Sequence, residues 1–158
     1  MKMDKEYYTP AVEEFHVGFE YEQNYDIVLT AQELAEQEST WDTKVFEVKD
    51  YEFIEHLVKT EYVRVKHLDR EDIKSLGWDY TRTQYGLVHR FTRDGGVSDM
   101  AKGTFILVFN SEKFLVTIIF EEENFGIPVD SVQRFVLFDG RLENKNELKT
   151  LMKWVQIK

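Results

Sequence analysis

The chain has 158 residues, of which 42% are hydrophobic and 32% charged, a composition typical of one folded domain. The absence of cysteine excludes disulfides, thiolate nucleophiles and cysteine-ligated zinc. A formal net charge of −10 argues against general binding to nucleic acids or anionic membranes, but it permits one small anionic ligand in a local basic pocket or a basic protein partner.

The N-terminus begins Met1-Lys2-Met3 without an apolar stretch after it, so no secretory signal peptide is expected there. No run reaches the ~18 apolar residues that a membrane-spanning helix needs. We therefore expect a cytoplasmic protein. Aromatic residues make up 15% of the chain, which favours strands and leaves aromatic surface for a ligand or a partner.

Residues 1–10 are expected to form a tail, and residues 11–158 a single α+β domain. Apolar and polar residues alternate along 12–23, the pattern of a half-buried strand. Weaker strands are expected at 26–30 and 44–48, and the polar segment between them is either a short helix or a loop.

Two helices and one strand are predicted next. An aspartate can cap a helix at 50–59, and alternation then indicates a strand at 62–68. Asp69, with Asp72 three residues later, resembles a capping box that opens a short helix. Gly77 is placed to end that helix in a left-handed conformation.

The middle of the chain is densest in strand-forming residues. Segments 78–83 and 86–93 can pair with each other, and the apolar runs 103–109 and 113–120 flank a short turn, Asn110-Ser111-Glu112, which indicates a hairpin. Because the second pair is hydrophobic at nearly every position, its strands are expected to be central and covered on both faces.

The last elements predicted are a strand at 132–138 and a C-terminal helix. Asn144 and Glu147 form the capping box of this helix, and apolar residues recur after them at the i, i+3, i+4, i+7 spacing of one helical face. The fold predicted is α+β, with a mainly antiparallel, strongly curled sheet of about five to seven strands packed by two or three helices.

The first predicted strand places Glu14, His16 and Glu20 on one face, where they could hold a divalent metal or perform acid–base chemistry. Gly18 between them would leave room for a ligand. The alternative is a solvated face whose glycine marks a bulge. Because one strand supplies few ligands, these residues are only weak candidates for a metal site, and no cofactor is predicted.

Six residues are candidates for binding an anionic ligand: Arg64, Lys66, Arg70, Arg93, Lys102 and Thr104. The first three form a small positive patch in an acidic protein, although surface ion pairs with the abundant acids are the alternative. The other three belong to the long segment 93–103, whose paired glycines could cradle a phosphate with backbone amides. The alternative for this segment is a mobile connection between hairpin strands.

Motifs for nucleophilic catalysis are missing from the sequence, which has no Gly-x-Ser-x-Gly and no Ser-x-x-Lys with its partner motifs. The question of an enzyme stays open, with a non-catalytic role preferred. The acidic run at 121–123 is either a solvated turn or a patch for a basic partner.

Three strings resemble small uncharacterised accessory proteins of tailed phages of gut bacteria: YYTP at 7–10 with EEFHVGFEYE at 13–22, RVKHLDREDIKSLGW at 64–78, and NKNELK at 144–149. The family has no assigned activity, so the resemblance implies no catalytic residue. It implies a setting, a phage protein that acts in the cytoplasm of the host bacterium. In that setting a small protein can counter host defence by sequestering a nucleotide signal or by binding a host protein.

The leading hypothesis is therefore a non-catalytic phage accessory protein, an anti-defence factor that sequesters a small anionic ligand such as a signalling nucleotide. Two alternatives remain open, a module that inhibits a host protein through an acidic surface, and a metal-dependent enzyme that uses the first strand. A homodimer is also expected, because the hairpin strands are apolar on both faces. Val116 and Ile118 are the positions chosen to probe that interface.

Overall fold

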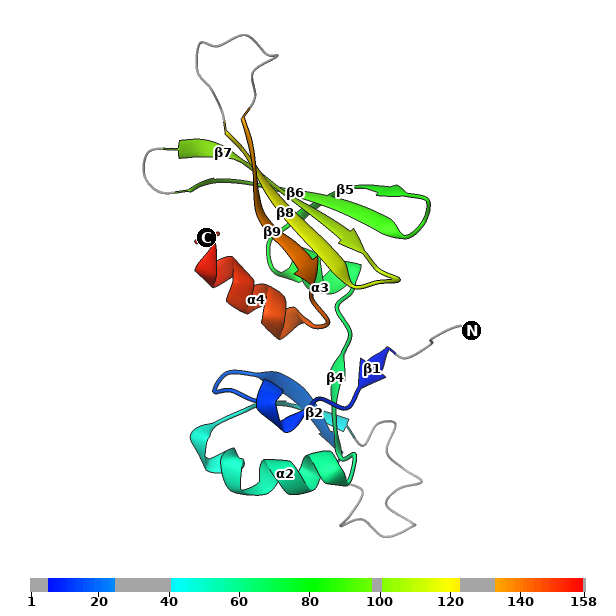
Figure 1. The fold of residues 1–158 in the computed structure, drawn as a ribbon. Helices are drawn as coiled ribbons and strands as arrows, with labels where there is room; N and C mark the ends of the chain where they lie inside the picture. Colours follow the sequence, from blue (N-terminus) through cyan, green and yellow to red (C-terminus); the bar gives the residue numbers. More distant parts are fainter. Residues whose placement is uncertain (1–5, 25–40, 98–100, 123–132, 158) are drawn as a thin grey trace. The chain divides into compact units, whose positions relative to one another are not determined.

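The computed structural model describes residues 6–24, 41–97, 101–122 and 133–157 (Figure 1). The chain divides into two compact units, Met1–His67 (unit 1) and Leu68–Lys158 (unit 2). Each unit has its own antiparallel sheet and its own hydrophobic core. The domain predicted for 11–158 therefore contains two cores. The strand predicted at 26–30 lies outside the described residues.

Unit 1 contains a four-stranded antiparallel sheet with the strand order β1-β4-β2-β3. Its strands are β1 (Tyr7–Tyr8), β2 (Glu20–Asn24), β3 (Trp41–Val45) and β4 (Val63–Lys66), and its helix is α2 (Tyr51–Lys59). The core between helix and sheet is largely aromatic and consists of Phe15, Phe19, Tyr21, Phe46, Ile54, Val63 and Val65. The predicted helix at 50–59 and the predicted strand at 62–68 are both confirmed, with β3 overlapping the weaker strand at 44–48.

The prediction of one long strand at 12–23 is wrong for its first part. Val12–Glu14 forms a 3-10 turn, because the Glu14 carboxylate accepts hydrogen bonds from the Ala11 backbone N–H at 2.8 Å and from the Tyr8 hydroxyl at 2.7 Å. Gly18 then reverses the chain with φ +92°. Only Glu20–Asn24 pairs as a strand, so alternation alone misassigned a capped turn.

Unit 2 contains a five-stranded antiparallel sheet in which the strands follow one another in chain order. They are β5 (Asp79–Gln84), β6 (Val88–Val97), β7 (Ala101–Asn110), β8 (Leu115–Glu122) and β9 (Arg134–Arg141). Both predicted hairpins are confirmed, and β7 and β8 lie in the centre of the sheet as expected.

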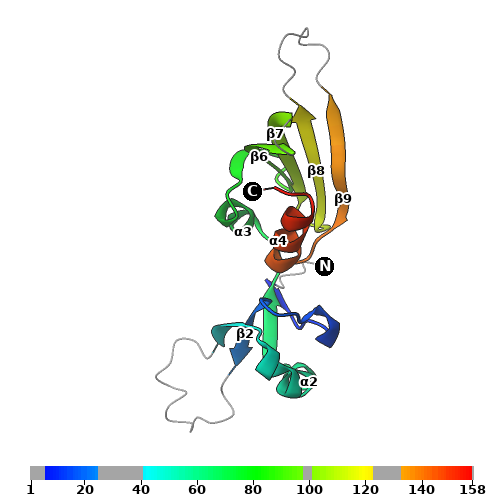
Figure 2. The same cartoon turned by 90° about the vertical axis from the view of Figure 1, so that its left-hand side faces the viewer.

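Helices α3 (Arg70–Ser75) and α4 (Lys145–Trp154) lie on the same side of this sheet, as Figure 2 shows. Ile73 of α3 and Leu148 of α4 are both 0% exposed and belong to one core with the inward side chains of β7 and β8. The capping box predicted for α3 is present. At α4 the Asn144 side chain accepts from the Glu147 N–H at 3.0 Å as predicted, but the Glu147 carboxylate accepts from the Glu143 N–H at 2.5 Å. Gly77 follows α3 with φ +85°, as predicted.

The predicted single curled sheet is wrong, because the strands are divided between two open sheets and neither is strongly curled or closed. Two helices cover the apolar side chains on one face of the larger sheet, so the sheet does not have to curl to bury them. Val116 and Ile118 point into this core and are both 0% exposed. They are core positions rather than probes of a dimer interface, and the homodimer stays a prediction.

No helix in the described ranges has both the length and the apolar character that crossing a membrane requires.

Candidate functional site

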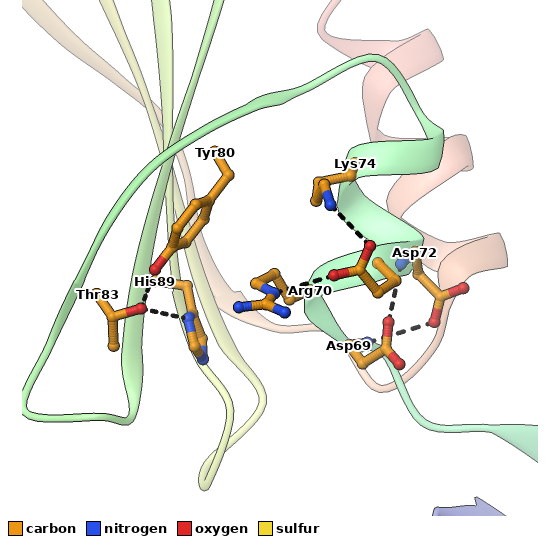
Figure 3. A network of polar contacts seen from close by, with 8 residues as sticks. Asp69, Arg70, Asp72, Lys74, Tyr80, Thr83 and His89 are labelled. Atoms are coloured by element: carbon orange, nitrogen blue, oxygen red, sulfur yellow. Dashed lines mark hydrogen bonds and ion pairs between the residues drawn. The ribbon is translucent and has the colours of Figure 1, made fainter.

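Four side chains of unit 2 gather where α3 faces the β5–β6 hairpin, and we call them the Arg70 cluster: Arg70, Tyr80, Thr83 and His89 (Figure 3). The capping box fixes the start of α3. The Asp69 carboxylate accepts from the Asp72 N–H at 2.8 Å, and the Asp72 carboxylate accepts from the Asp69 N–H at 3.4 Å. Arg70 is the first residue after this cap, so the box sets the direction in which its side chain leaves the helix.

Strand register brings the other three members of the cluster to one face of the hairpin. Tyr80 lies opposite Phe91 and Thr83 lies opposite His89, while an irregularity between Tyr80 and Arg82 shifts the register. This irregularity puts two residues three positions apart on the same face, which regular alternation would not do. Arg82, opposite Arg90, is left on the other face.

Thr83 is the hydrogen-bonding centre of the hairpin side of the cluster. Its hydroxyl is hydrogen-bonded both to the Tyr80 hydroxyl and, at 3.1 Å, to Nδ1 of His89. The imidazole of His89 stacks at 6.2 Å on the buried ring of Phe109. Two hydroxyls and one imidazole therefore sit side by side in an ordered arrangement.

Arg70 supplies the positive charge of the cluster. Its guanidinium carbon lies 5.4 Å from the centre of the Tyr80 ring, and Figure 3 shows the group directed toward Tyr80 and His89. Nε donates to Glu71 at 3.1 Å, and Glu71 also accepts from Lys74 at 2.8 Å. The hydrogen bond from Lys74, opposed by burial and aided by Arg70, lowers the pKa of the Glu71 carboxyl. Arg70 therefore shares its counter-ion, and its side chain is half exposed.

The positive charge of Arg70 affects the pKa of the His89 imidazole. This pKa is lowered from the ordinary value of 6.5, first by burial and then by the positive charge of Arg70. At neutral pH the ring is therefore mainly uncharged, and Nδ1 can accept a hydrogen bond from the Thr83 hydroxyl. An anion bound between Arg70 and His89 would oppose the part of the pKa shift that Arg70 causes, because a negative charge favours the protonated ring.

The six residues predicted to bind an anion are divided between the two units. Arg64 and Lys66 belong to β4 of unit 1 and Arg70 to unit 2. The Arg64 guanidinium is held between the Tyr7 and Trp41 rings at 3.8 and 4.1 Å, and Glu22 accepts from its Nε at 2.7 Å. These contacts occupy both faces and one edge of the group, so Arg64 serves the packing of unit 1.

The predicted phosphate-cradling loop at 93–103 is mostly strand, which corrects that interpretation. β6 and β7 pair from Val88–Asn110 out to Val97–Ala101, so their backbone amides serve the sheet. Arg93 donates to the Leu76 carbonyl at 2.6 Å and thereby holds the end of α3. Thr104 donates to Asp94 at 3.3 Å, and Lys102 lies exposed opposite Gly96. Residues 98–100 lie outside the described residues.

The three weak metal candidates are not aligned as the predicted strand would align them. Glu14 uses both carboxylate oxygens in the turn, His16 Nδ1 lies 3.0 Å from the Glu14 carbonyl oxygen, and Glu20 begins β2. Within 6–24, 41–97, 101–122 and 133–157, no group of three His, Asp or Glu side chains is placed to hold a metal ion.

Of the Arg70 cluster, only Arg70 was a sequence candidate. Tyr80, Thr83 and His89 were missed because the register of the β5–β6 hairpin depends on Tyr85, which takes the left-handed conformation with φ 55° just before Gly86. A two-residue turn at Gln84-Tyr85, the one the sequence suggests, would pair Thr83 with Gly86. The comparisons with known proteins add no residue to this cluster. No family model matches the chain, and no curated protein or solved structure matches it either.

Proposed function

We propose that this protein is a non-catalytic binding protein that takes a small anionic ligand, such as a phosphate-bearing nucleotide, at the Arg70 cluster. The observation that carries this proposal is the Arg70 guanidinium directed at Tyr80 and at a neutral His89, with two hydroxyls beside it. Guanidinium, hydroxyl and protonated imidazole are the groups that donate to phosphate oxygens in proteins.

The cluster can change its protonation to suit an anion. Without a ligand, Arg70 and His89 would repel each other if both were charged. Burial is the larger cause of the lowered pKa of His89, and this repulsion is the second. A bound anion would lie between two cations and allow His89 to take up a proton. Because Glu71 already engages Lys74 as well, Arg70 can exchange part of this exposed ion pair for a ligand at small cost.

Aromatic surface beside the cluster supports a nucleotide rather than a bare inorganic anion. Tyr80 is 37% exposed, and Tyr85 at the tip of the same hairpin is 95% exposed. Base–aromatic stacking contributes about 1–3 kcal/mol per base, so a nucleotide could place its phosphate at Arg70 and its base on one of these rings.

Binding is favoured over catalysis by the surroundings of His89. The 3.1 Å contact between the Thr83 hydroxyl and Nδ1 has the spacing of a nucleophile and its base. The pKa shift of His89 has two causes, burial and Arg70, and no carboxylate contributes to it. Among the described residues, the orienting acid that completes such a triad is therefore missing from the electrostatic neighbours of His89.

The biological role that fits this proposal is the sequestration of a signalling nucleotide by a phage accessory protein. The resemblance of the strings at 7–22, 64–78 and 144–149 to phage proteins supports it, as does a site built for binding. A sequestering protein needs affinity and no turnover, so an ordered cluster with one strong cation meets the requirement.

Calorimetric titration with a panel of cyclic and linear nucleotides tests the proposal. At least one nucleotide should bind, and Arg70→Gln should weaken its affinity about tenfold or more, because a hydrogen bond to a charged group is lost. Arg82→Gln is the matched control, because it removes an equal charge from β5, on the face of the strand opposite to Tyr80 and Thr83. No heat with any nucleotide up to high micromolar concentration would contradict the proposal, as would equal losses in both variants.

A further inference from the structure

An open hollow lies on unit 1, and we infer that it receives the cationic side chain of an arginine or lysine from a partner protein. This Trp41 hollow has a volume of about 400 Å³. The residues lining it that bear on this inference are Glu6, Tyr7, Trp41, Glu61 and Arg64. None of them belongs to the Arg70 cluster, so this site is independent of the anion site.

The positive charge of Arg64 is compensated inside unit 1 and does not repel a cation strongly. Both Nε and Nη2 of Arg64 lie 2.7 Å from the same Glu22 oxygen, in side chains that are only 28% and 25% exposed. Charge-assisted pairs of this kind are short and strong, and here the two stacked rings also hold the guanidinium in place.

With Arg64 compensated, carboxylates dominate the electrostatics of the hollow. Glu6 and Glu61 both line it and are both exposed. The pKa of the Tyr7 phenol is raised by burial and then by Glu22 and Glu6, and together these two carboxylates have a larger effect than the opposing charges of Arg64 and Lys66. A negative potential therefore acts at the wall of the hollow, which is the sign that attracts a cation.

The aromatic walls give the hollow a second way to bind a cation. Tyr7 and Trp41 hold one guanidinium between them already, which shows that their faces suit this group. A basic side chain from outside would meet Tyr7 and Trp41 at the wall of the hollow and the carboxylates of Glu6 and Glu61 at its rim.

The occupant is identified as a side chain of a basic protein by two features of the molecule. The hollow is open rather than enclosed, and it therefore suits a residue presented on another surface. The formal net charge of −10 steers a basic partner toward the protein, with the hollow as the place where one cation is held.

NMR titration of the full-length chain with a blocked Gly-Arg-Gly tripeptide tests this inference, with the Trp41 indole N–H signal as the reporter. The neutral citrulline tripeptide has nearly the same shape and is the matched ligand. We expect the arginine peptide alone to shift the Trp41 signal. Glu61→Gln should weaken its binding about two- to fivefold, the effect of losing one exposed charge pair.

Glu55→Gln is the control variant, because Glu55 is an exposed acid on α2 whose ion-pair partner is Lys59 at 3.6 Å. It changes the net charge equally and should leave the affinity unchanged. The inference is overturned if the citrulline peptide binds as well, if both variants weaken binding alike, or if the Trp41 signal stays fixed up to tens of millimolar arginine peptide. A Trp41 response to sulfate in place of the peptide would overturn it as well.

Discussion

Gly103 shows how strongly one residue of unit 2 is constrained by its packing. A Cβ at this position would lie 2.1 Å from the Glu121 carbonyl oxygen and 2.8 Å from the Phe120 ring. Gly95 lies opposite Gly103 in the register, and a Cβ there would lie 2.9 Å from the Phe105 ring. The two glycines therefore leave the space in which the Phe105 and Phe120 rings pack at 5.0 Å.

Gly103→Ala should therefore destabilise the protein by about 1–3 kcal/mol, the usual cost of overpacking a core. Gly86→Ala is the comparison, because its Cβ would meet nothing within 4 Å and only its φ of +71° is unfavourable. That change should cost about 1 kcal/mol. Chemical denaturation measures both, and a loss for Gly103→Ala no greater than for Gly86→Ala would refute the packing account.

Three arginines among the predicted anion-binding residues have three different roles, which sequence alone could not assign. Arg64 is held between two rings, Arg93 caps the end of α3, and Arg70 faces His89. The residue type and a local basic pattern were visible in the sequence. The partners were not, because they come from elements distant in the chain, such as β1 and β3 for Arg64.

At the scale of elements, α3 connects the fold to the candidate site. It has only six residues and depends on its capping box and on Ile73, which is 0% exposed. Helices this short have little stability of their own, so the cap and the tertiary contact hold it in place. Any loss of the cap should move Arg70, the first residue of the helix.

Asp69→Ala should cost about 0.5–2 kcal/mol of stability and also weaken nucleotide binding, because it removes the acceptor of the Asp72 N–H. Asp69→Asn keeps an acceptor oxygen and should preserve most of both properties. Denaturation and calorimetry on the two variants give the comparison. If both variants bind nucleotide as tightly as the unchanged protein, α3 does not position Arg70 for the ligand.

The elements predicted correctly are those that a cap, a glycine or a turn marks within a few residues of sequence. The α3 capping box, the Asn144 cap of α4, the left-handed Gly77 and the 103–120 hairpin were found this way. The failures arose where two local signals compete. Alternation along 12–23 suggested a strand while the Glu14 cap stabilised a turn. Glycines at 95, 96 and 103 suggested a loop, whereas Gly95 and Gly103 are strand residues packed against aromatic rings.

At the scale of the whole molecule, the sequence predicted the α+β class but not the division into two cores. No linker composition marks the boundary at His67, because the strand β4 leads directly into the cap of α3. On the outer face of the larger sheet, Ile119 lies between Ile106, which is 2% exposed, and Val136, which is 65% exposed. The predicted homodimer would use this face rather than the one that holds Val116.

The most direct test of the anion site is the pKa of His89 measured by NMR on the intact protein. In the ligand-free protein the pKa of His89 should lie below 6.5, its value in the unfolded chain. At any pH between the folded-state pKa and 6.5, the folded protein therefore binds fewer protons than the unfolded chain. The stabilising effect of His89 is then complete above pH 6.5 and is lost as the pH falls through this window. An anion that favours protonated His89 must bind more tightly over the same fall in pH.

Sulfate is a suitable probe because its charge stays constant between pH 5 and pH 8, and chloride at equal ionic strength is its control. His89→Gln assigns the resonance, while the exposed His16 and His56 report any general salt effect. We predict that saturating sulfate raises the pKa of His89, that chloride does not, and that Arg70→Gln abolishes the difference. A His89 pKa that is the same in sulfate and in chloride would contradict an anion site at the Arg70 cluster.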